Sequence, residues 1–518
     1  MARNSKIVIA KNIKIDKEYK EVLDYSEQQM LNLIDTNKVA TALDYSFIRD
    51  KGTISTHFTY SQCLQCNYMA FQNPDYDNKW FFAWIDDIRY VNDGTTEISY
   101  TIDAWSTWFD YLSVTSSFVI REHVQDDTRG LHTLPENVET GEYVNHSTGT
   151  LYENDATVVI ATTFYPTSSS TGTDVSGSFA FGIYSGARLY AMKDYAATNQ
   201  FLSWCASNGK ADSVQYIFMI PNWIIRRDEW AEPIADFTDI NGFYDATTIS
   251  TQLTVPTTVD GYTPKNNKLL TFPYCFLGVS NNAGANIIYK YEDIELTNNK
   301  FTVYSDGTVT PSGSIKTYIP SYKEAITSYD GGITGAKYPI CSWATDVFTN
   351  WLTQNGVNIA LDVAGGIMTA IGGIGTQNAA TFGSGIMSIA STVASVYQHS
   401  LASDTVQGNV NSGDVAFTTN NNVMSYAFRG VKSEYAKVID EYFSRYGYLV
   451  NTNKVPNISG RAYWNYIQIA ESETLGFGEI PQRFLDEINR IARTGTTVWH
   501  DHANIGDYTL NNAIVPIS

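Results

Sequence analysis

Apolar side chains recur at every second position along much of the chain, a spacing that predicts β-strands with one buried face. The clearest example is segment 68–102, where aromatic and aliphatic residues alternate on both sides of Asp93-Gly94. Because Asp-Gly suits the two-residue turn between antiparallel strands, this segment predicts a β-hairpin. Short apolar runs at Ile7–Ala10 and Ile54–Tyr60 predict further strands, so residues 1–60 are expected to contain strands and polar turns.

Helical spacing replaces this alternation at a few places. Apolar residues three or four positions apart predict a short helix over 105–112 and a longer one over 435–446, which Gly447 would end. Another helix is expected over 481–495, and a helix is also possible near 191–205. The remaining expected elements are strands at Phe118–Ile120, Arg461–Ala470, Thr496–Trp499 and Tyr508, and hairpins around Asn298-Asn299 and Asp306-Gly307. The pattern therefore predicts a mainly β (α+β) fold.

One segment, Gly356–Ser403, differs from the rest of the chain because it is long, apolar and almost without charge. It contains no Asp, Glu, Lys or Arg from Val363 to Ser403, and its isoleucines and valines recur at helical spacing on both sides of a polar turn at Gln377-Asn378. We expect two helical arms joined by a flexible bend, because each glycine inside a helix costs about 1 kcal/mol relative to alanine. The apolar positions are Ile359, Val363, Ile367, Met368, Ile371, Ile374, Phe382, Ile386, Met387, Ile389, Val393 and Val396, and the hinge glycines are Gly356, Gly372, Gly373, Gly375, Gly383 and Gly385.

Two interpretations of this segment remain open from its own residues. Neither arm reaches the ~20 apolar residues that span a bilayer, so we exclude a single-pass anchor. Transferring its larger apolar side chains out of water is favourable by about 20–40 kcal/mol, so the segment must be covered. It is either a helical hairpin buried in the protein core or a membrane-active loop, exposed only under some conditions and similar to a fusion peptide in composition.

Composition and charge narrow the function classes. The 518 residues carry a formal net charge of −20, which argues against a nucleic-acid-binding protein, since such a protein needs a basic patch to neutralise phosphates. The sign of the charge is compatible with a channel surface past which DNA slides. The N-terminus offers an apolar run of only four residues before lysines return, so we expect no secretory signal.

Candidate chemistry is sparse. The chain has five cysteines, and Cys63-Leu-Gln-Cys66 lies in a strand-like run without a second pair, which favours a structural role over redox or metal chemistry. His500 and His502 would share a strand face and could hold a metal, but a third ligand is not evident. We therefore predict neither a metal nor a cofactor.

The remaining charged pairs are ambiguous. Asp86-Asp87 and Asp126-Asp127 are more typical of solvated acids than of an acid/base pair. Arg226-Arg227, beside Trp223 and Trp230, could bind a glycan or an anion, although a strand end with extended arginines explains them as well. Metalloprotease, serine-hydrolase, phosphate-loop and dinucleotide motifs do not occur. We predict no catalytic residue.

The ordered motifs at both ends of the chain resemble a known family. They are, in order, Phe71–Asn73, Asp75-Tyr76, Asn78–Phe81, Gly94–Thr96, Ile102-Asp103, Thr107-Trp108, Phe118–Val124, Arg429-Gly430, Glu434-Tyr435, Tyr446–Tyr448, Pro456-Asn457, Asn465-Tyr466, Trp499-His500 and Asn504–Gly506. This set is similar to the tail-knob, or distal tail-tube, proteins of small short-tailed podoviruses of the picovirus type, which infect Gram-positive bacteria. It covers about the first 145 and the last 100 residues.

The resemblance implies a structural protein at the tail tip of a virion, assembled in the host cytoplasm. Members of this family form homo-hexameric tubes with β-barrel-like domains, contact other tail proteins (the lower collar or tail tube and a tail-tip enzyme), and pass genomic DNA through the lumen without specific binding. In its members a long hydrophobic loop plugs the tube and is released to form a pore in the host membrane, and the resemblance implies this role for Gly356–Ser403. The implied domains are an N-terminal tube domain (1–145), an inserted β-rich knob (146–320), a connector (321–355), the loop (356–403) and a C-terminal tube segment (404–518).

A different class of function stays open as the alternative. A tail-associated receptor-binding protein or cell-wall hydrolase would need a binding cleft, or paired carboxylates or a metal, most plausibly within 146–320. We expect assays on purified cell walls and images of the assembled protein to separate these alternatives.

Overall fold

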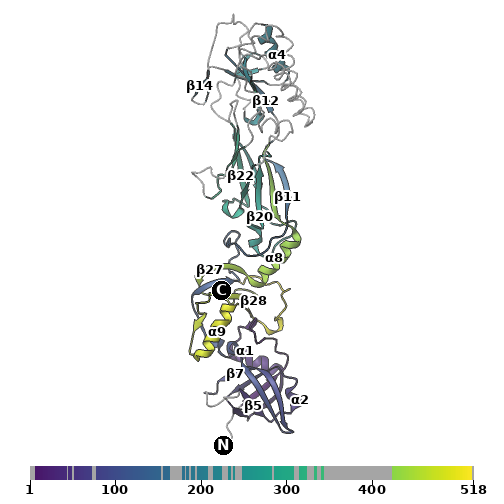
Figure 1. The fold of residues 1–518 in the computed structure, drawn as a ribbon, viewed down its shortest axis with the longest axis vertical. Coiled ribbons are helices and arrows are strands. Elements are labelled where there is room, and N and C mark those ends of the chain that lie inside the picture. Colours follow the sequence, from purple (N-terminus) through teal and green to yellow (C-terminus); the bar gives the residue numbers. More distant parts are fainter. Residues whose placement is uncertain are drawn as a thin grey trace, which may run out of the picture. The chain divides into compact units, whose positions relative to one another are not determined.

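The computed structural model describes residues 6–43, 45–48, 52–72, 77–152, 156–163, 178–180, 183–185, 188–192, 195–207, 214–224, 231–234, 237–239, 248–282, 285–307, 314–323, 332–334, 340–342 and 423–515 (Figure 1). They form two compact units, between which the chain passes four times. Unit 1 contains 1–142, 262–269 and 432–518, and unit 2 contains 143–261 and 270–431. The uncharged segment Gly356–Ser403, with all its apolar and hinge positions, lies outside the described residues.

Unit 1 begins with a seven-stranded antiparallel sheet in the order β3-β1-β6-β7-β8-β5-β4. Its strands are β1 (Lys6–Ala10), β3 (Lys38–Ala42), β4 (Ser46–Ile48), β5 (Thr53–Thr56), β6 (Tyr68–Gln72), β7 (Trp80–Asn92) and β8 (Thr95–Ile102). The expected hairpin is confirmed, because β7 and β8 pair through Asn92 and Thr95 around Asp93-Gly94.

The core of this sheet is apolar and strongly aromatic. The helix α3 (Ala104–Trp108), followed by a 3-10 turn (Phe109–Tyr111), packs on β7, and both Trp105 of α3 and Phe82 of β7 are fully buried. The buried Asp103 carboxylate accepts hydrogen bonds from Ser106 N at 3.0 Å and from Tyr68 Oη at 2.7 Å, so it both caps α3 and satisfies a buried hydroxyl. The predicted short helix is therefore confirmed.

Two expectations for the N-terminal residues are wrong. A helix, α1 (Glu27–Thr36), interrupts the strands, and it begins with a capping box in which Ser26 and Gln29 exchange hydrogen bonds. The Cys63-to-Cys66 motif belongs to the short helix α2 (Tyr60–Cys63) and its following turn, not to a strand. Thr59 and Gln62 form a second capping box there, and this local pairing favours a helical turn over an extended chain.

A second sheet of unit 1 has the order β2-β30-β28-β10-β27. Its strands are β2 (Glu21–Leu23), β10 (Ser117–Glu122), β27 (Tyr448–Lys454), β28 (Trp464–Ile469) and β30 (Thr496–Trp499), and only the β2–β30 pair is parallel. Two short strands, β9 (Ser113–Val114) and β29 (Gly476–Phe477), pair with each other in a separate antiparallel sheet. The strands expected at 118–120, 461–470 and 496–499 are confirmed. Tyr508 lies in a turn, so the strand expected there is wrong.

Both predicted C-terminal helices are confirmed. The helix α8 (Ser433–Tyr446) ends at Gly447, whose φ of 65° suits glycine, and an added Cβ would lie 2.0 Å from the Glu122 carbonyl oxygen. The helix α9 (Gln482–Thr494) begins after Pro481 and ends at Gly495. The helix lies beside β28 (Figure 1), and its apolar residues Ile488 and Ile491 are buried.

The described residues of unit 2 form mainly antiparallel strands, in three larger sheets. The first has the order β11-β26-β20-β21 and contains β11 (Tyr143–Thr150), β20 (Cys275–Ser280), β21 (Asn286–Tyr289) and β26 (Ser425–Val431). The second has the order β19-β22-β23-β24 and contains β19 (Ile249–Thr254), β22 (Lys300–Gly307), β23 (Ile315–Tyr318) and β24 (Ile333–Thr334). Short 3-10 turns lie at Asn222–Ile224 and Tyr291–Asp293.

The third sheet has the order β17-β18-β15-β12-β16-β25. Its strands are β12 (Ala156–Thr162), β15 (Arg188–Met192), β16 (Val214–Pro221), β17 (Ala231–Ile234), β18 (Phe237–Asp239) and β25 (Ile340–Ser342), and β13 (Ser178–Ala180) pairs separately with β14 (Ile183–Ser185). The helix α4 (Tyr195–Ser207) confirms the helix expected near 191–205.

The hairpins expected near 298 and 306 are only partly correct. Asn298 and Asn299 do form a tight turn with positive φ, closed by a bridge between Thr297 and Lys300. Asp306 and Gly307 are not a turn, because they extend β22 and pair with Lys316 and Ile315 of β23. The described residues confirm a mainly β fold with short helices, whereas closure of these sheets into barrel-like domains stays a prediction.

Candidate functional site

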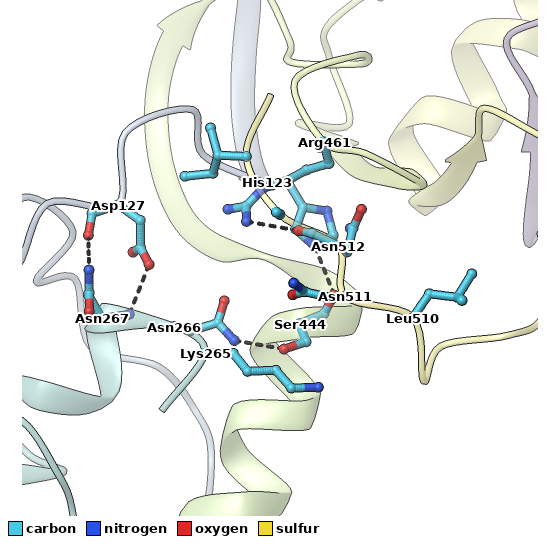
Figure 2. A pocket seen from close by; sticks show the side chains of 12 residues that line it. His123, Asp127, Lys265, Asn266, Asn267, Ser444, Arg461, Leu510, Asn511 and Asn512 are labelled. Carbon is cyan, nitrogen blue, oxygen red and sulfur yellow. Dashed lines mark hydrogen bonds between the residues drawn. The ribbon is translucent and has the colours of Figure 1, made fainter. Parts of the chain in front are cut away.

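A cavity of about 330 Å³ opens in unit 1 where three segments that are distant in the sequence meet (Figure 2). One segment follows β10, one is 262–269, and one comprises α8 and the C-terminal residues. The cavity is lined by His123, Asp127, Lys265, Asn266, Asn267, Ser444, Arg461, Leu510, Asn511, Asn512, Ala513 and Ile514. We call it the Arg461 pocket.

The segment 262–269 is held in unit 1 by the carboxylate of Asp440, a buried residue of α8. Asp440 accepts hydrogen bonds from Tyr262 Oη and Lys265 N, each at 2.7 Å, and from Asn266 N at 3.1 Å. The Asn266 side-chain amide also donates to Asp440 Oδ1 and to Ser444 Oγ, at 2.9 and 2.8 Å. One carboxylate thereby supplies acceptors for backbone groups of an irregular segment, and this fixes the floor of the pocket.

Asp127 anchors the other end of the same segment. Its carboxylate accepts a hydrogen bond from Asn267 N at 2.9 Å, and its carbonyl oxygen accepts from Asn267 Nδ2 at 2.7 Å (Figure 2). The carboxylate also accepts from Tyr448 Oη at 2.7 Å. Burial raises the pKa of Asp127 above its usual value, although these hydrogen bonds oppose the shift. Its neighbour Asp126 is exposed and caps a turn at Thr128, so the two acids have separate roles.

Arg461 carries the pocket's buried positive charge. Only 9% of the residue is exposed, and its guanidinium donates to the carbonyl oxygens of Val124 at 3.0 Å and Asn512 at 3.4 Å. Its Nε is buried and has no hydrogen-bond partner among the residues that the structure describes. Burial lowers the pKa of Arg461, opposed by the negative charge of Asp127. Within the described part of the chain, no carboxylate lies within 4.0 Å of the guanidinium nitrogens.

His123 is neutral in this setting. Its Nδ1 accepts a hydrogen bond from Tyr466 N at 2.7 Å, which leaves Nε2–H to donate to the Ser444 carbonyl oxygen at 3.0 Å. Burial, together with the positive charge of Arg461, lowers the pKa of His123 to about 3. A histidine that stays neutral near pH 7 and has both nitrogens engaged is not arranged to exchange protons with a ligand.

A buried ionic cluster lies in the same part of unit 1. The side chain of Glu136 is fully buried and forms ion pairs with Arg121 and Lys268. It also accepts a hydrogen bond from Leu449 N at 2.9 Å, and Arg121 donates to the Gly447 carbonyl oxygen at 2.8 Å. Burial lowers the pKa of Lys268, while Glu136 opposes that shift. This cluster ties the strand β10, the segment 262–269 and β27 together.

The motifs singled out in the sequence lie apart from this pocket. Cys63 and Cys66 are buried free thiols, and burial raises their pKa to about 11 and about 12, which suits packing rather than thiolate chemistry. Asp86, at a bulge of β7, pairs with Lys17. Arg226-Arg227 lie outside the described residues.

The two C-terminal histidines do not share a strand face. His500 Nδ1 faces Asp24 Oδ2 at 2.7 Å, whereas His502 begins a 3-10 turn (His502–Asn504) and its Nε2 accepts from Lys14 N at 3.0 Å. A metal site formed by this pair is therefore not supported. Within the described ranges, no group of three or more His, Cys, Asp or Glu residues is placed to hold a metal ion. None of the helices described there is both long and apolar enough to cross a bilayer.

Sequence reasoning missed the Arg461 pocket and the Glu136 cluster. Their residues come from three segments separated by more than a hundred positions, and Lys265-Asn266-Asn267 has the composition of an ordinary polar turn. The sequence offers only a weak signal, namely isolated charged residues inside apolar strands, such as Arg121 in β10.

Two protein-family models match the chain. A family model described as the C-terminal domain of the Bacillus phage phi29 tail knob protein gp9 matches residues 242–513, slightly more than half of the chain. A second model, the N-terminus of the caudoviral major tail protein, matches residues 3–113.

Curated relatives and a solved structure agree with the family models. The chain is 23% identical to tail knob protein gp9 of Bacillus phage PZA, over 90% of this chain and 91% of that protein, and 24% identical to its counterpart in Bacillus phage B103, over 88% of each. The solved tail knob protein gp12 of bacteriophage C1 shares the fold, with a TM-score of 0.67 at 14% identity over 99% of this chain and 100% of that one. The resemblance inferred from the ordered motifs is thereby confirmed, and the chain belongs to the family of bacteriophage tail knob proteins.

Proposed function

We propose that this chain is a structural protein of a phage tail tip, assembling as a homo-hexameric tube through which genomic DNA leaves without specific binding. The observation that carries the proposal is the family match, which joins a tail knob domain at 242–513 to a major-tail-protein N-terminus at 3–113. In this proposal the chain acts in the virion, beside other tail proteins such as the lower collar and a tail-tip enzyme, and has no catalytic role.

The proposed domains follow the predicted division of the chain. Residues 1–145 and 404–518 form the tube, 146–320 form the knob, and 321–355 connect the knob to the uncharged segment. Antiparallel sheets with edge strands support a role in assembly, because an edge strand presents unpaired backbone groups to a second chain. The edge strand β27, for example, exposes polar residues 451–453, which suits a contact between subunits that fold before they assemble.

An exposed apolar cluster at the tip of the β7–β8 hairpin supports subunit contact in the same way. Tyr90 and Val91 are 53% and 44% exposed, and the ring of Tyr60 packs edge-on against Tyr90 at 6.2 Å between centroids. Leu64, which directly follows α2, is 59% exposed. Large apolar side chains gathered at one exposed site are typical of a surface that another protein covers.

The segment Gly356–Ser403 is proposed to plug the tube lumen and, on contact with the host, to leave it and penetrate the membrane. Its support is compositional: it is long, uncharged and apolar at helical spacing, within a chain of net charge −20. Paired helical arms satisfy their own backbone hydrogen bonds in lipid, and several copies together could line a passage that one arm cannot form. Closely spaced glycine and serine would allow the arms to approach each other.

Assembly is tested by negative-stain imaging and mass photometry of the purified full chain. A hollow ring or tube with the mass of six chains supports the proposal, and a stable compact monomer contradicts it. The substitution Tyr90→Ser combined with Val91→Ser should weaken the assembly by removing apolar contact area. The matched control is Val438→Ser, which changes a 65% exposed residue on α8.

Membrane action is tested by dye release from liposomes. Protein lacking residues 356–403 should still assemble but should release much less dye than the intact chain. Equal release by both proteins would show that another part of the chain acts on the membrane. A deletion variant that fails to assemble would instead identify the segment as an assembly core.

The rival proposal, a cell-wall hydrolase, is tested by incubating the protein with purified cell walls and measuring released sugars and peptides. A glycosidase usually needs two carboxylates flanking the scissile bond, and the Arg461 pocket offers Asp127 as its one acidic residue. Release above that of a heat-treated control would contradict a purely structural role.

A further inference from the structure

Two positively charged side chains share the Arg461 pocket, and among the described residues neither has an acidic partner at ion-pair distance. Arg461 is nine-tenths buried, and its Nε has no hydrogen-bond partner in the described part of the chain. Lys265, an exposed residue, lines the same cavity, and within the described ranges its ammonium group forms neither an ion pair nor a hydrogen bond. Burying a guanidinium without a counter-ion is costly, so the pocket is electrostatically incomplete.

The acids nearest to these cations are already occupied. Asp127 lines the pocket but accepts hydrogen bonds from Asn267 N and Tyr448 Oη. Asp440 lies behind the segment 262–269 and accepts four hydrogen bonds from Tyr262, Lys265 N and Asn266. His123 adds no charge near pH 7, because its pKa is about 3. The lining therefore contains two cations and one carboxylate, and this excess of positive charge favours an anionic ligand.

The pocket is larger than a simple oxyanion requires. Its volume of about 330 Å³ corresponds to the small end of pockets that hold organic ligands. The side-chain amide of Asn511 and the side-chain oxygen of Asn267 form no hydrogen bond within the described part of the chain and are free for hydroxyl groups. Leu510, Ala513 and Ile514 add apolar side chains to the lining.

We propose that the Arg461 pocket binds a sugar-sized organic anion, in which a carboxylate or phosphate ester pairs with Arg461 and Lys265. The hydroxyl groups of the ligand would meet the asparagine amides, and its carbon skeleton would lie on the apolar side chains of the lining. The ligand would contact residues from 123–127, 262–269 and 510–514 together, so binding stabilises the junction of these three segments.

The test uses three ligands that share one ring and differ in charge. Glucuronate carries a carboxylate, glucose 6-phosphate carries a phosphate ester, and glucose is neutral. Isothermal titration of the full-length protein should show that at least one anion binds with one site per chain and at least about tenfold more tightly than glucose. Binding of glucuronate alone or of glucose 6-phosphate alone would identify the anionic group that the pocket prefers.

Two variants connect the binding to the pocket. Lys265→Gln removes one charge from an exposed side chain and should weaken binding of the preferred anion about three- to tenfold without altering the fold. Lys11→Gln, which changes an exposed lysine outside the pocket, should leave the affinity unchanged. Arg461→Lys keeps the charge but removes Nε and the planar fork, so it should weaken binding further.

The possible results divide clearly. Weaker anion binding in Lys265→Gln but not in Lys11→Gln supports the proposal, and a ligand-induced rise in Tm that is lost in Lys265→Gln adds to that support. Glucose binding as tightly as the anions, no binding of any of the three ligands, or equal effects of the two lysine substitutions would overturn it. If Arg461→Lys does not fold, the comparison of Lys265→Gln with Lys11→Gln still tests the proposal.

Discussion

Two regions of unit 1 achieve burial by opposite means. The strands of the seven-stranded sheet and α3 all lie within residues 6–108, and their core, to which residues between 464 and 505 also contribute, is almost entirely apolar and aromatic. The region around Glu136 and the Arg461 pocket is assembled from three distant segments and holds buried charges in hydrogen-bonded networks. Apolar packing tolerates many partners, whereas buried charges accept only matched ones, so the second region specifies which segments meet.

The largest effect is expected where the ionic region loses its central charge. Glu136→Gln leaves Arg121 and Lys268 buried without a counter-ion, so the free energy of unfolding should fall by about 3–5 kcal/mol. Urea titration of the full chain measures this change. Glu139→Gln, at an exposed acid three positions away, serves as the control and should change stability little. Similar small losses in both variants would mean that the buried pairs do not hold the segments together.

The apolar region should lose a comparable amount when its core is truncated. Phe82→Ala removes a fully buried ring from β7 and should cost about 3–5 kcal/mol, with little dependence on salt or on pH between 5.5 and 7.5. The same urea titration, repeated at two ionic strengths and at pH 5.5 and 7.5, measures the loss of stability and its dependence on salt and pH. Phe477→Ala, at a ring that is 64% exposed, should change stability by less than about 0.5 kcal/mol. If the stability lost in Phe82→Ala depended strongly on salt, the apolar region would not differ from the ionic region in how it is stabilised.

The pH dependence should come from the ionic region. Burial lowers the pKa of His123 to about 3, so as the pH falls below 6.5 the unfolded chain binds a proton that the folded chain does not. Stability is then lost as the pH falls from 6.5 towards 3, by about 1.4 kcal/mol between pH 7.5 and 5.5. His123→Gln, whose amide can accept from Tyr466 N and donate to the Ser444 carbonyl, should reduce that loss by this amount.

The comparison with the parent chain is essential in this experiment. The pKa values of His146 and His502 are also lowered by burial, and they contribute slopes of the same sign in both proteins. Only the difference between the two pH profiles reports on His123. Parallel profiles of the variant and the parent would show that His123 does not cause the acid sensitivity.

The smallest effect concerns a local signal in the apolar region. Ser26→Ala breaks the capping box of α1, in which Ser26 Oγ accepts from Gln29 N at 3.3 Å, and should cost about 1 kcal/mol. Thermal unfolding of the full chain measures it, with Ser61→Ala, at an exposed serine of α2, as the control. An unchanged Tm in the Ser26 variant would mean that packing of Met30 and Ile34, rather than the cap, defines the helix.

The sequence predicted best those elements whose signals are local. The β7–β8 hairpin follows from alternation around Asp93-Gly94, and α8 and α9 follow from helical spacing closed by Gly447 and Gly495. Where local signals competed, the prediction was wrong. Alternating apolar residues hid α1, although its capping box is readable, and Asp306-Gly307 resembles a turn but pairs within β22 because β23 lies beside it.

By its own residues, the sequence determined the mainly β class, the short helices, the uncharged segment and, through ordered motifs, the family. Only the tertiary structure decided that 262–269 belongs to unit 1 although the residues on both sides of it belong to unit 2. It also decided that Arg461, Lys265 and Asp127 line one pocket. The physical reason is the range of the interactions involved. Periodicity and capping act over a few residues, whereas a buried charge is satisfied by whichever partner the fold brings near, at any distance along the chain.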